Sequence, residues 1–171
     1  MRRLKIVITG PFNSGKTEFV KSLSEIDVIN TEKKITIPEL AAIKGETTVA
    51  MDFGKVTIND DKIYLFGTPG QHHLHIMWEV LTENMIGFIV VVDSTDRKRF
   101  KEAREIIKFF SDILEEPYVI AANKQDIAGA ATIDELKKEL GLKEGDIILP
   151  CAATDKKTTM PVLEALIKTV K

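Results

Sequence analysis

Residues 10–17 read Gly10-Pro11-Phe12-Asn13-Ser14-Gly15-Lys16-Thr17, and they lie between the apolar run of residues 4–9 and the helical pattern of residues 17–24. Between a strand and a helix, glycines let the backbone curl so that successive N–H groups point at phosphate oxygens. The lysine then supplies a cation, and the threonine supplies a hydroxyl for Mg²⁺. This stretch predicts a phosphate-binding P-loop, and with it an α/β chain that binds a nucleoside triphosphate.

A second motif indicates which base is bound. Asn123-Lys124-Gln125-Asp126 follows the strand-like residues 117–122, which places it at the carboxyl edge of a parallel sheet, where such folds bind ligands. The Asp126 carboxylate can accept from the ring N–H and the exocyclic amine of guanine, two donors that adenine lacks. Asn123 either ties this loop to the P-loop or reaches the purine, and the Lys124 stem can cover the face of the base. The motif therefore predicts guanine.

Strand-like and helical patterns alternate along the chain. We expect parallel strands at residues 4–9, 63–66, 86–92, 117–122 and 146–149, an antiparallel edge strand at 49–58, and helices at 15–25, 73–84, 98–115, 132–140 and 158–170. This alternation predicts a three-layer α/β/α sandwich. Residues 26–46 carry no clear element, as a functional loop would. Asp93-Ser94-Thr95-Asp96 is expected to cap the helix near Arg97, and a nucleotide role for Asp93 is the alternative.

With these motifs in place, the chain resembles the small Ras-like GTPases from Leu4 to its last helix. Residues 48–54, which read T-V-x-x-D-F-G, and residues 67–71 are similar to a prokaryotic branch near the bacterial gliding-motility polarity GTPases and the Arf-like proteins. The resemblance implies a single P-loop NTPase G domain over residues 1–171, with a six-stranded, mostly parallel sheet and one antiparallel edge strand. It also implies a molecular switch that hydrolyses GTP to GDP and phosphate. A GTP-loaded binding module with little turnover is the alternative.

The nucleotide contacts of the family can be carried over residue by residue. Pro150-Cys151-Ala152-Ala153 resembles the family's last guanine loop, in which the Ala152 N–H would meet the carbonyl oxygen of the base. The implied nucleotide-binding residues are Gly10, Asn13, Ser14, Gly15, Lys16, Thr17, Thr48, Gly70, Asn123, Lys124, Asp126, Cys151 and Ala152.

Residues 45–49 resemble switch I, the loop that is ordered by the triphosphate. By this resemblance, Thr48 coordinates Mg²⁺ together with Thr17, and its N–H contacts the γ-phosphate. A one-residue slip would give the role to Thr47, and the β-branched run also fits the start of a strand.

Residues 67–71 resemble switch II. The resemblance implies that the Gly70 N–H meets the γ-phosphate and that Gln71 orients the attacking water, the positioning role that phosphoryl transfer requires. Gln71 and Lys16 are therefore the predicted catalytic groups.

The family motif D-x-x-G carries an aspartate where this chain has Gly67. That aspartate hydrogen-bonds Mg²⁺-bound water, so another group must replace it or the metal will bind more weakly. If residues 49–58 pair antiparallel with residues 62–66, Asp52 lies beside Gly67 across the ladder and can take this role. The alternative is that Asp52 is an ordinary solvent-facing strand residue.

Two P-loop residues bear on the rate of hydrolysis. Asn13 resembles the asparagine with which some GTPases recruit K⁺ to the phosphates, although its tolerance of turns explains it equally well. Phe12 can crowd the site where a partner's arginine would enter. Because residues 19–96 contain no arginine, neither switch can supply one in cis. We expect slow intrinsic hydrolysis and a partner that acts mainly by ordering Gln71.

The composition excludes several classes of protein. At 171 residues, 44% hydrophobic and 29% charged, the chain is expected to form one domain that is neither disordered nor membrane-embedded. A net charge of −2 gives no basic field for nucleic acid. Cys151 is the only cysteine, so an internal disulfide is excluded, and no export or lipidation signal is evident. We expect a cytoplasmic protein with no direct membrane anchor, whose partners are GTP or GDP and protein regulators and effectors.

Overall fold

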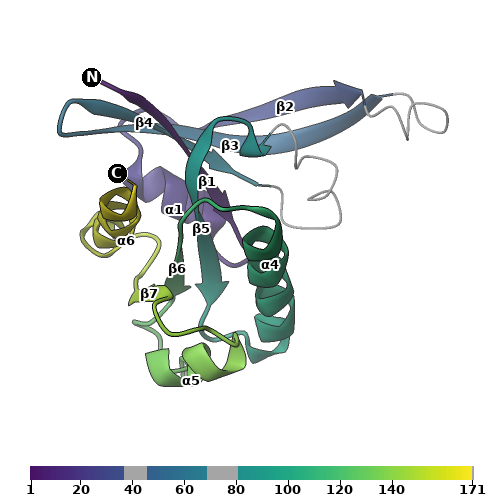
Figure 1. Cartoon of the computed structure of the whole chain (residues 1–171), viewed down its shortest axis with the longest axis vertical. Coiled ribbons are helices and arrows are strands. Elements are labelled where there is room, and N and C mark those ends of the chain that lie inside the picture. The colour runs from purple at the N-terminus through teal and green to yellow at the C-terminus, as the bar shows by residue number, and fades with distance from the viewer. Residues whose placement is uncertain (37–45, 69–80, 171) are drawn as a thin grey trace.

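The structure, a computed structural model, describes residues 1–36, 46–68 and 81–170 (Figure 1), with only the backbone course of residues 30–36 and 46–50. The elements are β1 (Arg3–Thr9), α1 (Lys16–Leu23), β2 (Ile29–Thr36), β3 (Glu46–Ile58), β4 (Asp61–Gly67), β5 (Met85–Asp93), the short 3₁₀ helix η1 (Arg97–Arg99), α4 (Phe100–Ile113), β6 (Tyr118–Asn123), α5 (Ile133–Glu139), β7 (Ile147–Pro150) and α6 (Lys156–Thr169). The helix predicted at residues 73–84 falls largely outside the described residues.

The strands form one sheet in the order β2-β3-β4-β1-β5-β6-β7. β3 is antiparallel to its neighbours β2 and β4, and the other four neighbouring pairs are parallel. The three-layer α/β fold and the mostly parallel sheet with one reversed strand are confirmed.

The reversed strand does not form the edge, however. β2 lies within the stretch expected to be a loop, and it pairs along β3 from Ile29 opposite Phe53 to Thr36 opposite Glu46, which makes it a seventh strand. The charged residues Glu32-Lys33-Lys34 in its middle interrupt the apolar pattern by which the other strands are predicted. In Figure 1 the far ends of β2 and β3 reach beyond the rest of the sheet.

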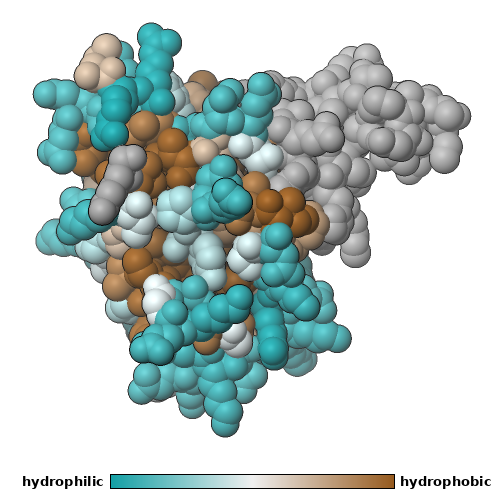
Figure 2. Space-filling view, viewed as in Figure 1, coloured by the Kyte–Doolittle hydropathy of each residue, from teal (hydrophilic) through white to brown (hydrophobic). Residues whose placement is uncertain are grey.

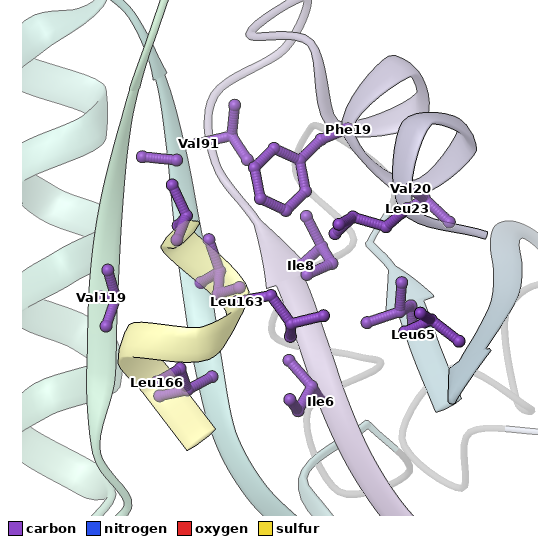
Figure 3. Close-up of a cluster of buried hydrophobic side chains, with 14 of the residues drawn as sticks. Ile6, Ile8, Phe19, Val20, Leu23, Leu65, Val91, Val119, Leu163 and Leu166 are labelled. Atoms are coloured by element: carbon purple, nitrogen blue, oxygen red, sulfur yellow. The ribbon is translucent and has the colours of Figure 1, made fainter. Parts of the chain in front are cut away.

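Both faces of the sheet are covered by helices. α1 and α6 lie on one face and α4 lies on the other (Figure 1). Alternate residues of β1 serve the two cores: Ile6 and Ile8 pack with Phe19 and Leu163 (Figure 3), and Val7 belongs to the cluster on the α4 side. This alternation follows from the pleat of a strand.

The outer surface seen in Figure 2 is largely hydrophilic toward α5, and hydrophobic residues show mainly in the middle of the view. Within the described ranges, no helix is both long and apolar enough to cross a membrane.

The sheet brings the sequence motifs together. Because β1, β5, β6 and β7 are parallel, their carboxyl ends meet at one edge, where such folds bind ligands. The loops that follow these strands are residues 10–15, 94–96, 124–126 and 151–155. Three of the four are the stretches that predicted phosphate and guanine binding.

Candidate nucleotide-binding site

The backbone of the P-loop has the curl that its glycines predict. Gly10, Asn13 and Gly15 have positive φ angles of 144°, 61° and 105°, which glycine adopts freely and asparagine tolerates. A side chain at Gly10 would come within 2.2 Å of the Val91 carbonyl oxygen, and one at Gly15 within 2.2 Å of the Asn123 amide nitrogen. Glycine is therefore required at both positions, by conformation and by close packing.

Lys16 lies buried against this loop. Its Nζ donates to the carbonyl oxygens of Gly10, at 2.9 Å, and Pro11, at 2.7 Å. Burial lowers the pKa of Lys16 to about 8, although the negative charges of Glu102 and Asp52 oppose the shift. A buried ammonium group is stabilised by an anion nearby, so phosphate oxygens at this loop would favour its charged form.

Asn123 joins the P-loop to the two guanine loops. Its side chain is 2% exposed, and its Nδ2 donates to the Ser14 carbonyl oxygen at 2.9 Å. Its Oδ1 accepts from the N–H groups of Lys124 and Ala153, both at 2.8 Å. Of the two roles predicted for Asn123, the structure shows the tie to the P-loop.

The guanine loop and the last loop lie against each other. The Gln125 N–H donates to the Cys151 carbonyl oxygen at 3.3 Å. Burial, together with the negative charge of Asp126, raises the pKa of the Cys151 thiol to about 12, so the thiol stays protonated. The Asp126 side chain is exposed and makes no hydrogen bond or ion pair with any residue that the structure describes. Its carboxylate is therefore available for the two donors of guanine.

The N–H of Ala152 has a partner that the sequence did not suggest. It donates to Thr158 Oγ1 at 2.9 Å, and the same hydroxyl lies 2.9 Å from the Ala152 carbonyl oxygen. The predicted contact of Ala152 with the guanine carbonyl oxygen therefore requires Thr158 to share or release this N–H.

The loop after β5 does not cap η1 as expected. Asp96 is the N-cap residue, but its side chain makes no capping hydrogen bond. The carboxylate of Asp93 instead accepts from the N–H and hydroxyl of Thr95 and pairs with Lys124 Nζ at 2.6 Å. Asp93 thus contacts the guanine loop.

Thr17 and Asp52 meet at the start of α1. Thr17 Oγ1 donates to Asp52 Oδ2 at 2.5 Å. Asp52 is the register partner of Gly67, as the predicted ladder requires, and a side chain at Gly67 would lie 3.1 Å from the Asp52 Cβ. The carboxylate of Asp52 therefore takes the space next to Gly67, and it contacts a predicted Mg²⁺ ligand rather than only solvent.

These two side chains fit a magnesium ion. Mg²⁺ prefers hard oxygen ligands, keeps several waters and is often held by one or two side chains plus phosphate oxygens. The Thr17 hydroxyl and the Asp52 carboxylate are such oxygens. In residues 1–36, 46–68 and 81–170 there is no cluster of three or more His, Cys, Asp or Glu suited to a metal. A site here would depend on the hydroxyl, on waters and on the nucleotide.

The remaining predicted contacts belong to the switches. The backbone of Thr48 lies in β3, opposite Lys34 of β2, and that of Thr47 lies opposite Ile35. The strand alternative for this run is thus observed. Gly70 and Gln71 lie outside the described residues.

Arg99 is a cation near the P-loop that sequence analysis missed. Its Cζ lies 5.6 Å from the centre of the Phe12 ring, and its guanidinium pairs with Glu102 at 2.9 Å and with Asp96 at 3.4 Å. Arg99 lies just after residues 19–96, the stretch that contains the switches and no arginine. Arg99 lies near Phe12 because β5 pairs with β1. No local sequence pattern predicts that pairing.

Known proteins are similar to this chain in sequence and in fold. The sequence model of the ADP-ribosylation factor family matches residues 1–170. ADP-ribosylation factor-like protein 5A of Bos taurus is 30% identical over 141 residues, which are 81% of this chain and 71% of that protein. ADP-ribosylation factor-like protein 3 of Caenorhabditis elegans is 30% identical over 149 residues, with coverages of 82% and 71%.

A solved structure agrees in fold. The Arl6 BBS3 small GTPase of Trypanosoma brucei, with the bound nucleotide analogue GppNp, superposes with a TM-score of 0.75 over 98% of this chain and 97% of that chain, at 23% identity. The predicted resemblance to Ras-like small GTPases is confirmed, and the finer placement near the gliding-motility polarity GTPases stays a prediction. The family match over nearly the whole sequence shows that this chain belongs to the ADP-ribosylation factor family of small GTPases, which act as nucleotide-dependent switches.

Proposed function

We propose that this chain binds GTP with Mg²⁺ as a single domain and hydrolyses GTP to GDP and phosphate, slowly unless a partner assists. The main support is the Asn123 side chain, whose bonds join the phosphate site and the base site. The Ser14 hydroxyl supports phosphate binding, because it is buried in the P-loop without a hydrogen-bond partner among the described residues. Such a group is costly unless something bonds it. One continuous sheet and a family match over residues 1–170 support one GTP-binding domain.

In phosphoryl transfer the protein contributes mainly by positioning the reacting groups and by stabilising negative charge, and little by covalent chemistry. Lys16 would offset the negative charge that develops on the oxygens between the β- and γ-phosphates. Gln71 would hold the attacking water in line with the leaving oxygen. A bound Mg²⁺, held by Thr17 and Thr48 and supported by Asp52, would supply further neutralisation of charge.

Slow turnover without a partner is supported by the tip of the P-loop. Phe12 is 48% exposed there, and the Arg99 guanidinium already lies over its ring. A partner's arginine would meet both an aromatic ring and a like charge. We therefore expect an activating partner to act mainly by ordering Gln71.

Replacing Gln71 by Leu tests the proposed hydrolysis. The rate of GTP cleavage in a single turnover should fall at least about tenfold, because misplacing a reacting group by about 1 Å can cost on the order of 100-fold. The affinity for GDP should stay within about twofold, since Gln71 would act only on the transition state. The measurement is phosphate release from bound GTP with Mg²⁺, with and without K⁺.

Three outcomes of this assay test the K⁺ site, the role of Gln71 and hydrolysis itself. A faster wild-type rate in K⁺ than in Na⁺ would support a cation beside Asn13. Equal cleavage by wild type and Gln71→Leu would reject the role of Gln71. A wild-type protein that binds GTP but never cleaves it would leave the GTP-loaded binding module as the function.

Replacing Asp52 by Asn tests the metal site. The Mg²⁺ concentration needed to slow GDP release by half should rise about 10- to 100-fold, the usual cost of losing a group that orients a metal ligand. The measurement is the release of fluorescent GDP across a Mg²⁺ titration. Asp60→Asn is the matched control, because Asp60 is an exposed carboxylate on the turn after β3. If the two variants titrate alike, Asp52 does not support the metal.

The remaining partners are expected at the switches. Members of this family bind GTP and GDP and work through protein regulators and effectors. For this chain we place those contacts at residues 45–49 and 67–71. A cytoplasmic location without a direct membrane anchor stays a prediction.

A further inference from the structure

Asp93 ends β5 beside the guanine loop. It is the register partner of Asn123 on β6, and its side chain is only 11% exposed. Its Oδ1 accepts from the Thr95 N–H at 2.9 Å and from the Thr95 hydroxyl at 2.6 Å, which fixes the carboxylate. Its Oδ2 is left for Lys124 Nζ, at 2.6 Å.

The pair between Asp93 and Lys124 is stronger than an ordinary surface pair. Both side chains are at least partly shielded, at 11% and 34% exposure, so solvent screens them less. Burial alone would raise the pKa of Asp93, but the hydrogen bonds from Lys124 and Thr95 outweigh it and hold the pKa below its ordinary value. The carboxylate is thus ionised at neutral pH and holds the ammonium group.

The position of this ammonium matters because of Asp126. Lys124 and Asp126 are two residues apart on one loop, and Lys124 has a positive φ of 62°, which sets the direction of its stem. Asp126 is exposed and has no hydrogen bond or ion pair with the described part of the chain. A long lysine side chain freed from Asp93 would find Asp126 as the unpaired carboxylate within its own loop. A Lys124–Asp126 pair would compete directly with guanine for the same oxygens.

We propose that Asp93 is a positioning residue for guanine recognition, which holds the Lys124 ammonium group and so keeps the Asp126 carboxylate free for the base. This rests on the proposed guanine site. It also assigns a use to the lysine of the motif: its Nζ is held at Asp93, at the end of β5, so that its stem can lie along the nucleotide.

Asp93→Asn is the variant that tests this role. The dissociation constant for GDP should rise about tenfold, which corresponds to about 1.4 kcal/mol. The preference for GDP over IDP should fall as well, because IDP lacks the exocyclic amine and depends less on both Asp126 oxygens. Both constants can be measured by displacement of fluorescent GDP. Asp96→Asn removes a half-buried carboxylate of the same loop, which pairs with Arg99 and not with Lys124, and it should change neither constant by more than about twofold.

A double-mutant cycle separates positioning from a merely structural effect. In a Lys124→Met background, which keeps an apolar stem but no charge, Asp93→Asn should weaken GDP binding less than about twofold, because there is no ammonium left to misplace. Thr95→Val removes one donor to Asp93 and keeps the ion pair, so it should also leave the GDP constant within about twofold.

The possible results separate a failure of the Asp93 inference from a failure of the proposed function. If Asp93→Asn weakens GDP binding equally with and without the Lys124 charge, or if Thr95→Val reproduces the loss, Asp93 acts only by shaping its loop and the inference is overturned. The same holds if Asp93→Asn leaves both constants unchanged. A wild-type protein that binds no guanine nucleotide would instead overturn the proposed function itself.

Discussion

Replacing Asp126 by Asn should weaken GDP binding by at least about 100-fold, which corresponds to about 2.7 kcal/mol. The Asp126 carboxylate would accept from two guanine donors, and hydrogen bonds to a charged group contribute about 1.5–3 kcal/mol each. An asparagine offers one acceptor and one donor, so the amide nitrogen would face a guanine N–H. Xanthine presents an N–H and a carbonyl oxygen at the same edge, so its diphosphate should bind the variant better than GDP does.

The measurement is competition of GDP, IDP and the xanthine diphosphate against one fluorescent nucleotide. Asp134→Asn, an exposed carboxylate in the first turn of α5, is the matched control and should leave the order of affinities unchanged. An Asp126→Asn protein that still preferred GDP would show that the base is read elsewhere.

Replacing Asn123 by Ala should lower both stability and nucleotide affinity. The change leaves the Ser14 carbonyl and the Ala153 N–H without their partner, and each unpaired buried group costs about 1–3 kcal/mol. A total of about 3 kcal/mol would lower the Tm by roughly 10 °C in a chain of this length. Thermal unfolding with and without GDP gives both effects, because a ligand that binds only the folded protein raises the Tm according to its affinity.

Gln125→Ala provides the comparison on the same loop. The Gln125 side chain donates to Ser94 Oγ and to the Ala131 carbonyl oxygen, both at 2.8 Å, and neither partner belongs to the P-loop. Because Ser94 and Ala131 are both buried, its loss should lower the Tm about as much, but it should leave the response to GDP largely intact. Equal losses of GDP stabilisation in the two variants would contradict the joining role of Asn123.

The parts of the site that the sequence predicted are those that depend on local backbone or on a single ladder. Gly10 and Gly15 are glycines because of positive φ angles and close contacts, which a short motif encodes directly. The position of Asp52 beside Gly67 follows from the register of one antiparallel pair, β3 with β4. Local rules of this kind act within a few residues of each other or across one turn.

The parts that were missed depend on strands that are distant in sequence. The contact between Asp93 and Lys124 exists because β5 and β6 end side by side, and Arg99 reaches Phe12 because β5 lies next to β1. β2 was missed for a different reason: its pairing with β3 supplies the order that its own charged sequence does not favour. In each case tertiary context decides the outcome and leaves no periodic signal in the sequence.

An aspartate at position 52, opposite Gly67, places the acidic group on a different strand from the one that carries it in the D-x-x-G motif. In a GTPase with the D-x-x-G aspartate, the strand that leads into switch II carries the acidic group, so a shift of that strand and a loosened cation are one event. Here the acidic group is built into β3, one strand away. With Asp52 in the proposed metal role, a shift of β4 and release of the cation would be separate steps, each with its own rate.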